Sequence, residues 1–448
     1  MKRFQSPPKG YGIVPFYWWL GDKLTKERLS WQLDQLEGHH ISGLQVNYAH
    51  SDQGGPSWGL TCESDPPLFS EDWWTLFGWF LQEAKKRGMS VSLSDYTLFA
   101  PGQGYFTDWV LQRRPDMQGQ LLHQHVQKVS RGEQVSIVLP APPLCAVIVH
   151  GSESIPVEGC MEDVQWRCTA PCEGELRVVY AAPEPFSFDP MHPDAGDEII
   201  REFFGMFERR FPGECGKGLN FFFSDELNFG IHGKLWDAFF ADAFIARKGY
   251  DIRPLLYLVF CEGNPEAVSM RLDYYDVIVA LEEENYFRKV CRWHEERGMT
   301  YGCDHGSRGY DVVEFGDYMR TQKYNQGPGC DQPGLASDII KNKVAASIAH
   351  LHHRPRVWLE GFYGSGWGTT STQLTDAIAR NYVMGQNLLS LHGLYYSTHG
   401  GWWEWAHRES LRIHSHPVQV GYRVRPDRAG MVDAPFAEWY HITGFGQA

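Results

Sequence analysis

Two glutamates, each placed directly after an apolar run, are the residues whose type and position best suit acid–base chemistry. Glu226 ends the stretch 221–226 (FFFSDE), and Glu360 ends the stretch 357–360 (VWLE). A single acid after a buried strand is also well explained as a helix cap or an ion-pair partner. Two such acids on separate strands favour catalysis, because cleavage of a glycosidic bond requires a proton donor and a second carboxylate.

Eight apolar runs, separated by helical patterns, predict the elements that would position these acids. The runs are at 13–19, 41–48, 90–99, 219–224, 299–303, a short run ending at Asp331, 356–359 and 388–395. Strands that alternate with helices predict parallel pairing with right-handed crossovers. Eight of them make a closed (β/α)8 TIM-type barrel of the α/β class the economical architecture, with its active site at the carboxyl ends of the strands.

The segment 117–186 interrupts this alternation. Its short β-rich runs and Pro/Gly turns predict a small β-rich insertion after the third strand. We therefore expect a first part of the barrel at 1–116, the insertion at 117–186 and the rest of the barrel at 187–406. Helical patterns fill 193–210, 234–248, 267–297, 335–351 and 373–384 of that last part. Residues 407–448 lack a helical stripe and are interpreted as an atypical, truncated C-terminal tail.

Polar and aromatic residues near the predicted strand ends are the candidates for substrate binding. Carboxylates, amides and imidazoles hydrogen-bond sugar hydroxyls, and indole rings give apolar platforms for sugar rings. Taken singly, each of them is as well explained by a helix cap or a loop anchor. The candidates are Trp18, Asn47, Asp95, Asp225, Asp304, His305, Asp331, Trp367, His392 and Tyr396.

Composition narrows the classes of partner. The net charge of -14, without a block of Lys or Arg, argues against nucleic acid and anionic membrane surfaces. The aromatic content of 14%, with 17 Trp, fits either a carbohydrate site or a Trp-rich core. The chain shows neither a signal peptide nor an apolar run of membrane-spanning length, so a cytoplasmic protein is expected. The sequence requires no cofactor, leaves a metal site undefined and does not indicate the oligomeric state.

Several segments together resemble glycoside hydrolase family 106, the α-L-rhamnosidase family, over residues 10 to 405. They are 15–22 (PFYWWLGD), 223–226 (FSDE), 345–350 (AASIAH), 359–367 (LEGFYGSGW), 385–387 (GQN) and 392–397 (HGLYYS).

The resemblance implies a (β/α)8 catalytic domain that removes terminal α-L-rhamnose from a glycoside or oligosaccharide with inversion. It implies Glu226 and Glu360 as the catalytic pair and, as in some members of the family, a calcium ion at the sugar site. We assign Glu226 as the general acid and Glu360 as the general base, and the reverse assignment stays open. Two alternatives stay open. One is a retaining exo-glycosidase of the same barrel type that acts on a different sugar. The other is a carbohydrate-binding remnant without catalytic activity.

Overall fold

The computed structural model describes residues 12–19, 22–39, 41–47, 65–93, 105–227, 229–231, 233–305, 318–362, 365 and 369–396. Within these ranges only the backbone is described at 105, 106, 108, 221–226, 303–305, 318 and 395. The predicted tail at 407–448 lies outside the described residues, as do Asp95 and Trp367. None of the helices in the described ranges combines the length and the apolar character that a membrane span requires.

Parallel strands pair in a ring, which is the connectivity predicted from the sequence. The strands form two parallel sheets, in the orders β17-β1-β2-β3 and β11-β13-β14-β15-β16. An isolated parallel bridge between Val91 of β3 and Leu219, which lies just before β11, links the two sheets. β17 continues from β16 and pairs in parallel with β1, so the pairings return to their starting strand. The strands are β1 (Phe16–Trp18), β2 (Gly43–Asn47), β3 (Ser90–Leu93), β11 (Phe221–Leu227), β13 (Thr300–His305), β14 (Gly327–Gln332), β15 (Trp358–Gly361), β16 (Leu388–Leu391) and β17 (Leu394–Tyr395).

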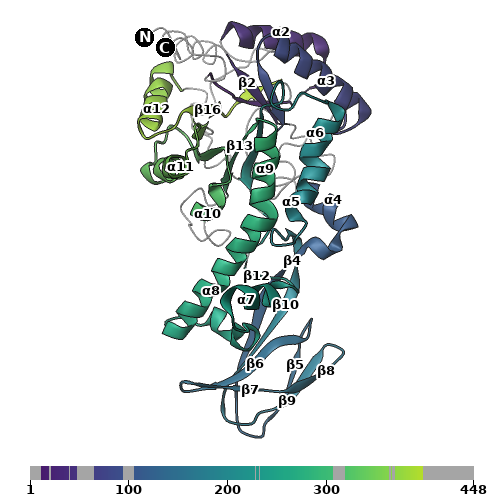
Figure 1. Cartoon of the computed structure of the whole chain (residues 1–448), viewed down its shortest axis with the longest axis vertical. Coiled ribbons are helices and arrows are strands. Elements are labelled where there is room, and N and C mark those ends of the chain that lie inside the picture. Colours follow the sequence, from purple (N-terminus) through teal and green to yellow (C-terminus); the bar gives the residue numbers. More distant parts are fainter. Residues whose placement is uncertain are drawn as a thin grey trace, which may run out of the picture.

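Helices connect these strands and cover their outer side (Figure 1). Their starts follow local capping rules. Ser70 caps α3 by accepting a hydrogen bond from the Trp73 amide at 3.2 Å, and Thr370 with Gln373 forms a capping box at α12. The helices are α2 (Lys26–Gly38), α3 (Glu71–Lys86), α4 (Tyr105–Arg113), α5 (Ala195–Ile199), α6 (Gly205–Arg210), α9 (Arg288–Glu296), α10 (Tyr318–Gln322), α11 (Ile339–Leu351) and α12 (Ser371–Val383). A π-helical turn at Ile200–Phe204 joins α5 to α6.

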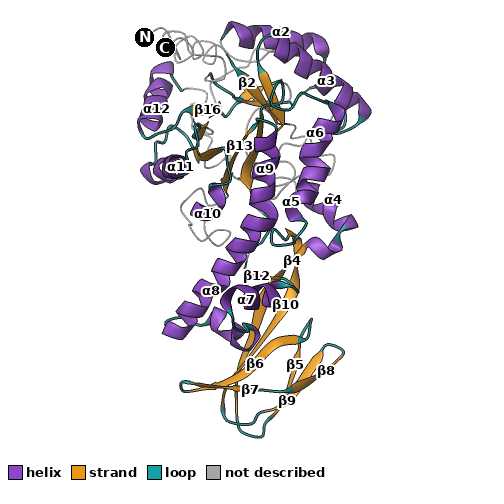
Figure 2. Ribbon diagram, in the orientation of Figure 1, coloured by secondary structure: helices purple, strands orange, loops and turns teal. Residues whose placement is uncertain are grey.

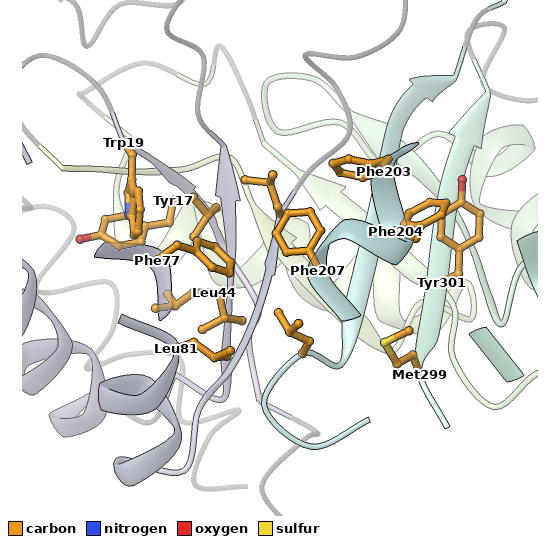
Figure 3. Close-up of a cluster of buried hydrophobic side chains, with 14 of the residues drawn as sticks. Tyr17, Trp19, Leu44, Phe77, Leu81, Phe203, Phe204, Phe207, Met299 and Tyr301 are labelled. Atoms are coloured by element: carbon orange, nitrogen blue, oxygen red, sulfur yellow. The ribbon is translucent and has the colours of Figure 1, made fainter. Parts of the chain in front are cut away.

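The largest apolar core lies between the strand ring and these helices, and aromatic side chains dominate it (Figure 3). Tyr17 of β1 and Trp19, just after it, pack against α3, with the rings of Trp19 and Phe80 4.8 Å apart in an edge-on arrangement. Phe204 stacks on Trp293 at 5.6 Å on the side of β13. A good part of the high Trp content is therefore core, which is the plainer of its two interpretations.

The β-rich segment forms two antiparallel sheets at the far end of the molecule from the strand ring (Figures 1 and 2). One sheet has the order β12-β4-β10-β6-β7, in which β12 (Lys234–Trp236) comes from a later part of the chain, and the other has the order β5-β9-β8. Apolar residues such as Ile148, Trp166 and Leu176 form a separate core there. The strands are β4 (Gln118–Val129), β5 (Gln134–Val138), β6 (Pro143–His150), β7 (Glu153–Pro156), β8 (Gly159–Glu162), β9 (Gln165–Thr169) and β10 (Gly174–Phe188), after a 3-10 turn at Pro115–Met117.

One sequence prediction is wrong here, since 234–248 is not a continuous helix. The chain first forms β12 (Lys234–Trp236), which pairs antiparallel with β4, and only then α7 (Phe240–Lys248). Leu235 and Trp236 are both buried by this pairing, and Asp237 accepts a hydrogen bond from the Phe239 amide at the turn into the helix. Tertiary burial of a two-residue apolar pair outweighs the local helical pattern.

A second core binds the β-rich segment to the helices that follow β12. Leu122 and Val179 of the segment share it with Trp236, Phe240 and Tyr274. Tyr274 belongs to α8 (Pro265–Glu282), which continues through a π-helical turn at Glu283–Phe287 into α9 and runs from the β-rich end to the strand ring (Figure 1). A 3-10 segment at Arg253–Phe260 packs on the same core.

Candidate active site

Side chains alternate between the two faces of a strand, and this alternation identifies which residues face the inside of the ring. Leu44 and Val46 of β2 pack in the apolar core between the strand ring and its helices, which we call the outer core, so Gln45 and Asn47 face inward. Leu359 of β15 packs in the outer core with α12, so Glu360 faces inward. The polar residues of these strands are thus on the inner face.

Glu360 is the predicted catalytic residue whose environment is described. Its side chain is 4% exposed, and its register partners on the adjacent parallel strands are Asp331 of β14 and Ser390 of β16. Register partners in neighbouring strands project to the same face. Three polar side chains therefore lie side by side at the carboxyl ends of β14, β15 and β16, where the site was expected.

Asp331 is held by a cation that the sequence analysis did not single out. The Nζ of Lys341, at the start of α11, lies 2.5 Å from Oδ1 of Asp331, and the two side chains are 9% and 1% exposed. Asp338 caps α11 by accepting a hydrogen bond from the Lys341 amide, which fixes where the lysine leaves the helix. Asp331 lies beside Glu360, with its carboxylate engaged in a buried ion pair.

A hydrogen bond past β1 extends the inward-facing polar residues from β16 to β2. Ser390 Oγ donates to Gln45 Oε1 at 3.3 Å. Gln45 in turn is the register partner of Ser92 on β3. We call Asp331, Glu360, Ser390, Gln45 and Ser92 the polar belt; it runs from β14 to β3 and contains the candidate catalytic base.

Aromatic rings and an amide lie beside the polar belt. Asn47 and Trp18 are register partners at the ends of β2 and β1, and both are 1% exposed. The His392 ring lies 5.4 Å from that of Trp18 and 5.1 Å from that of Phe16. Burial lowers the pKa of His392 to about 4, so the imidazole is neutral near pH 7. The arrangement suits a ligand that combines apolar faces with hydroxyl groups.

The other predicted catalytic residue lies at an irregularity of the strand ring. Ser224 pairs with Cys303 and Leu227 with His305, so two residues of β11, Asp225 and Glu226, stand opposite one residue of β13, Asp304. Such a β-bulge redirects side chains and occurs often beside active sites. The side chains of Asp225, Glu226, Asp304 and His305 are outside the described residues, and so are Asp95 and Trp367.

Tyr396 has a structural role that replaces the predicted one. Its hydroxyl donates to the Lys23 carbonyl at 2.8 Å and accepts from the Thr25 amide at 2.9 Å. The guanidinium of Arg28 lies 4.9 Å from the centre of its ring. These contacts anchor the end of β17 to the start of α2, so we remove Tyr396 from the sugar contacts.

Calcium, which the family resemblance implied, finds no ligand set among the described side chains. Nowhere in that part of the chain do three or more His, Cys, Asp or Glu gather so that they could hold a metal ion. In the polar belt, the carboxylate of Asp331 already pairs with Lys341, and Glu360 is the other carboxylate beside it. We derive no step of the mechanism through calcium.

Comparison with known proteins supports the fold. No family model and no curated protein matches the chain. Among solved structures, a rhamnosidase from Novosphingobium sp. PP1Y matches 88% of this chain with a TM-score of 0.61 and 13% sequence identity. This chain shares that fold. A β-galactosidase from the Antarctic haloarchaeon Halorubrum lacusprofundi matches 85% of it with a TM-score of 0.47 and 10% identity. The chain spans about half of each structure, 56% and 52% of their lengths.

Sequence reasoning missed Lys341, Gln45, Ser92 and Ser390. For Gln45 a signal was present, since 44–47 reads Leu-Gln-Val-Asn, with apolar and amide residues alternating. That period of two predicts amides on one face of a strand. For Lys341 the sequence carries no comparable signal, because its ion pair joins a helix start to a preceding strand end.

Proposed function

We propose that this chain is a glycoside hydrolase that removes terminal α-L-rhamnose, with Glu226 and Glu360 as its acid and base, on a closed (β/α)8 barrel. The observation that carries the proposal is the position of Glu360, buried and inward-facing at the end of β15 and flanked by polar register partners. The ring of parallel pairings and the fold shared with a rhamnosidase agree with it. The sequence resemblance to family 106 supplies the sugar.

In the proposed mechanism Glu226 protonates the glycosidic oxygen while Glu360 removes a proton from the attacking water. The water then adds to the anomeric carbon from the side opposite the leaving group, and the configuration inverts. β13 and β14 separate the two strands, so their backbones are three strand spacings apart, about 14 Å along the wall. The inverting outcome is the one that the resemblance to family 106 implies, and it corresponds to carboxyl groups roughly 6.5–9.5 Å apart, against about 5–5.5 Å in a retaining enzyme.

The described neighbours of Glu360 place little net charge beside its carboxyl group. Asp331 lies beside it with a negative charge that is already compensated by Lys341, so the pair of them adds little net charge. The uncharged Ser390 lies on its other side and the neutral imidazole of His392 follows in the same strand end. The assignment of Glu360 as the base, and of Glu226 as the acid, rests on the resemblance to family 106.

Hydrolysis of nitrophenyl α-L-rhamnopyranoside by the wild type, Glu226→Gln and Glu360→Gln tests the proposal. Each substitution removes an ionisable group while keeping its shape, and we expect kcat to fall about 100- to 10,000-fold. Glu282→Gln is the matched control. Glu282 is also a buried glutamate, 1% exposed, but belongs to α8 away from the ring. Full activity in both site variants would refute the carboxylate mechanism.

The stereochemical outcome separates the proposal from its main alternative. NMR of the first product should show the β anomer of rhamnose if the configuration inverts, and the α anomer if a retaining enzyme forms a covalent intermediate. Activity on a different nitrophenyl glycoside with retention would favour the other exo-glycosidase. Saturable sugar binding without turnover would favour a carbohydrate-binding remnant.

A further inference from the structure

We propose that Gln45, Asn47 and Ser92 form an uncharged wall inside the strand ring that recognises the hydroxyl groups of a neutral sugar. The proposal deepens the proposed function and rests on it for the class of ligand. It adds Gln45 and Ser92 to the site and assigns Asn47 a specific chemistry. We call these three residues the β2–β3 wall.

The β2–β3 wall carries buried polar atoms that make no hydrogen bond within the described part of the fold. In the described part of the chain, Gln45 Nε2, both side-chain heteroatoms of Asn47 and Ser92 Oγ have no hydrogen-bond partner. The three side chains are 0%, 1% and 1% exposed. Leaving a buried donor or acceptor unsatisfied is costly, so natural folds rarely do so without a partner such as water or a ligand.

The polar atoms of the β2–β3 wall that lack partners lie together on one surface. Gln45 and Asn47 are two residues apart on β2 and so face the same side. Ser92 is the register partner of Gln45 on β3. Their outward-facing neighbours Leu44, Val46 and Val91 belong to the outer core. The unused atoms therefore all face the inside of the ring.

Two fully buried amides elsewhere in the chain, those of Gln32 and Asn342, do have partners. Gln32 of α2 is 0% exposed; its carbonyl oxygen accepts from the Tyr17 hydroxyl and its amide donates to the Tyr396 carbonyl at 2.9 Å. Asn342 of α11 is also 0% exposed and donates to Asn381 Oδ1 at 2.7 Å. The folded chain itself supplies the partners of these two amides. In the β2–β3 wall, by contrast, Gln45 Nε2 and both side-chain heteroatoms of Asn47 have no hydrogen-bond partner among the described residues.

The chemistry of the β2–β3 wall selects the ligand. An asparagine amide offers two donor hydrogens and an acceptor oxygen, which matches two adjacent hydroxyl groups, and the serine hydroxyl both donates and accepts. None of the three side chains is charged, so the wall favours a neutral sugar over a sugar phosphate or a uronic acid. Trp18, the register partner of Asn47, lies beside it as an apolar surface. Ser390 links Gln45 to the strand next to Glu360.

Calorimetric titration of the full chain tests the proposal, with L-rhamnose, D-galactose and D-mannose as neutral probes and D-glucuronate as the charged comparison. We expect a neutral sugar to bind more tightly than glucuronate. Asn47→Leu and Gln45→Met keep the approximate volume and remove the hydrogen-bonding atoms. Each should weaken the binding of that sugar about tenfold or more, because each removes at least one hydrogen bond to it.

The melting temperature of the ligand-free protein is the second measurement. Because the wall residues use few of their polar atoms in the fold, Asn47→Leu and Gln45→Met should leave the melting temperature unchanged or raise it. Gln32→Met is the matched control, and should lower the melting temperature by several degrees without changing sugar affinity. Loss of stability with unchanged affinity in the wall variants would overturn the inference.

The outcomes also separate this inference from the proposed function. If the wild type hydrolyses the rhamnoside and both wall variants keep its affinity for sugar, only the inference fails. If neutral-sugar binding depends on the β2–β3 wall but neither the wild type nor Glu360→Gln turns over any glycoside, only the proposed function fails. Absence of neutral-sugar binding by the wild type would overturn both.

Discussion

Replacing Lys341 by methionine should destabilise the protein strongly, because it leaves the carboxylate of Asp331 buried without its counter-ion. The pair is joined by a 2.5 Å contact and is almost fully shielded from water, with side chains 9% and 1% exposed. Removing one partner of such a pair typically costs about 3–5 kcal/mol of unfolding free energy. We expect a loss of this size for Lys341→Met in urea unfolding followed by circular dichroism.

The double variant Lys341→Met/Asp331→Leu distinguishes an ion-pair effect from a packing effect. Both charges are then replaced by apolar side chains of similar size, and such replacements of buried ion pairs are often neutral or even stabilising. The double variant should therefore be more stable than Lys341→Met alone. A loss below about 1 kcal/mol in Lys341→Met, or a double variant whose loss equals the sum of the two single losses, would refute the reasoning.

Three further predictions concern single positions. Burial raises the pKa of Glu282, and its electrostatic interaction with Asp189 raises it further. The stability that this shift contributes is fully present below the ordinary glutamate pKa of about 4.3, and it is lost as the pH rises through the shifted pKa. Glu282→Gln should therefore raise the melting temperature at pH 8 and not at pH 4, and an equal gain at both would contradict this. A Cβ at Gly329 would lie 2.2 Å from Trp358, against 3.6 Å from its nearest neighbours at Gly327, so Gly329→Ala should cost about 1–3 kcal/mol or more and Gly327→Ala little in urea unfolding. Tyr396→Phe should lower stability by about 1–2 kcal/mol and leave the KM for the rhamnoside unchanged; a raised KM would return Tyr396 to the sugar contacts.

Most strands of the ring were predictable because they are apolar runs with clear breaks, whereas β14 (GPGCDQ) was placed mainly by its position between two helical patterns. Residues 41–48 and 388–395 are examples, and the structure has β2 and then β16 with β17 inside those limits. β12 was not predictable, since a three-residue strand is defined by the partner that buries Leu235 and Trp236 and not by its own pattern.

Some features of the candidate site could also be predicted from the sequence, and others could not. Glu360 and Asp331 could be placed from the sequence because their position at a strand end follows from the chain order of the elements. The hydrogen bond between Ser390 and Gln45 could not be predicted, because it joins residues 345 positions apart whose proximity depends on the ring returning to its first strands. Tyr396 was misread for the same reason, since its partners Lys23 and Thr25 are equally remote.

The pairing of β12 with β4 also bears on how the chain folds during synthesis. β4 leaves the ribosome more than a hundred residues before β12, and β11 of the ring lies between them in sequence. The sheet of the β-rich segment and the shared core around Trp236 and Phe240 therefore stay incomplete until the fourth strand of the ring has emerged. The segment and the ring are thus interleaved in the order of synthesis, and deleting residues 117–186 would expose β12 and one side of α7 and α8.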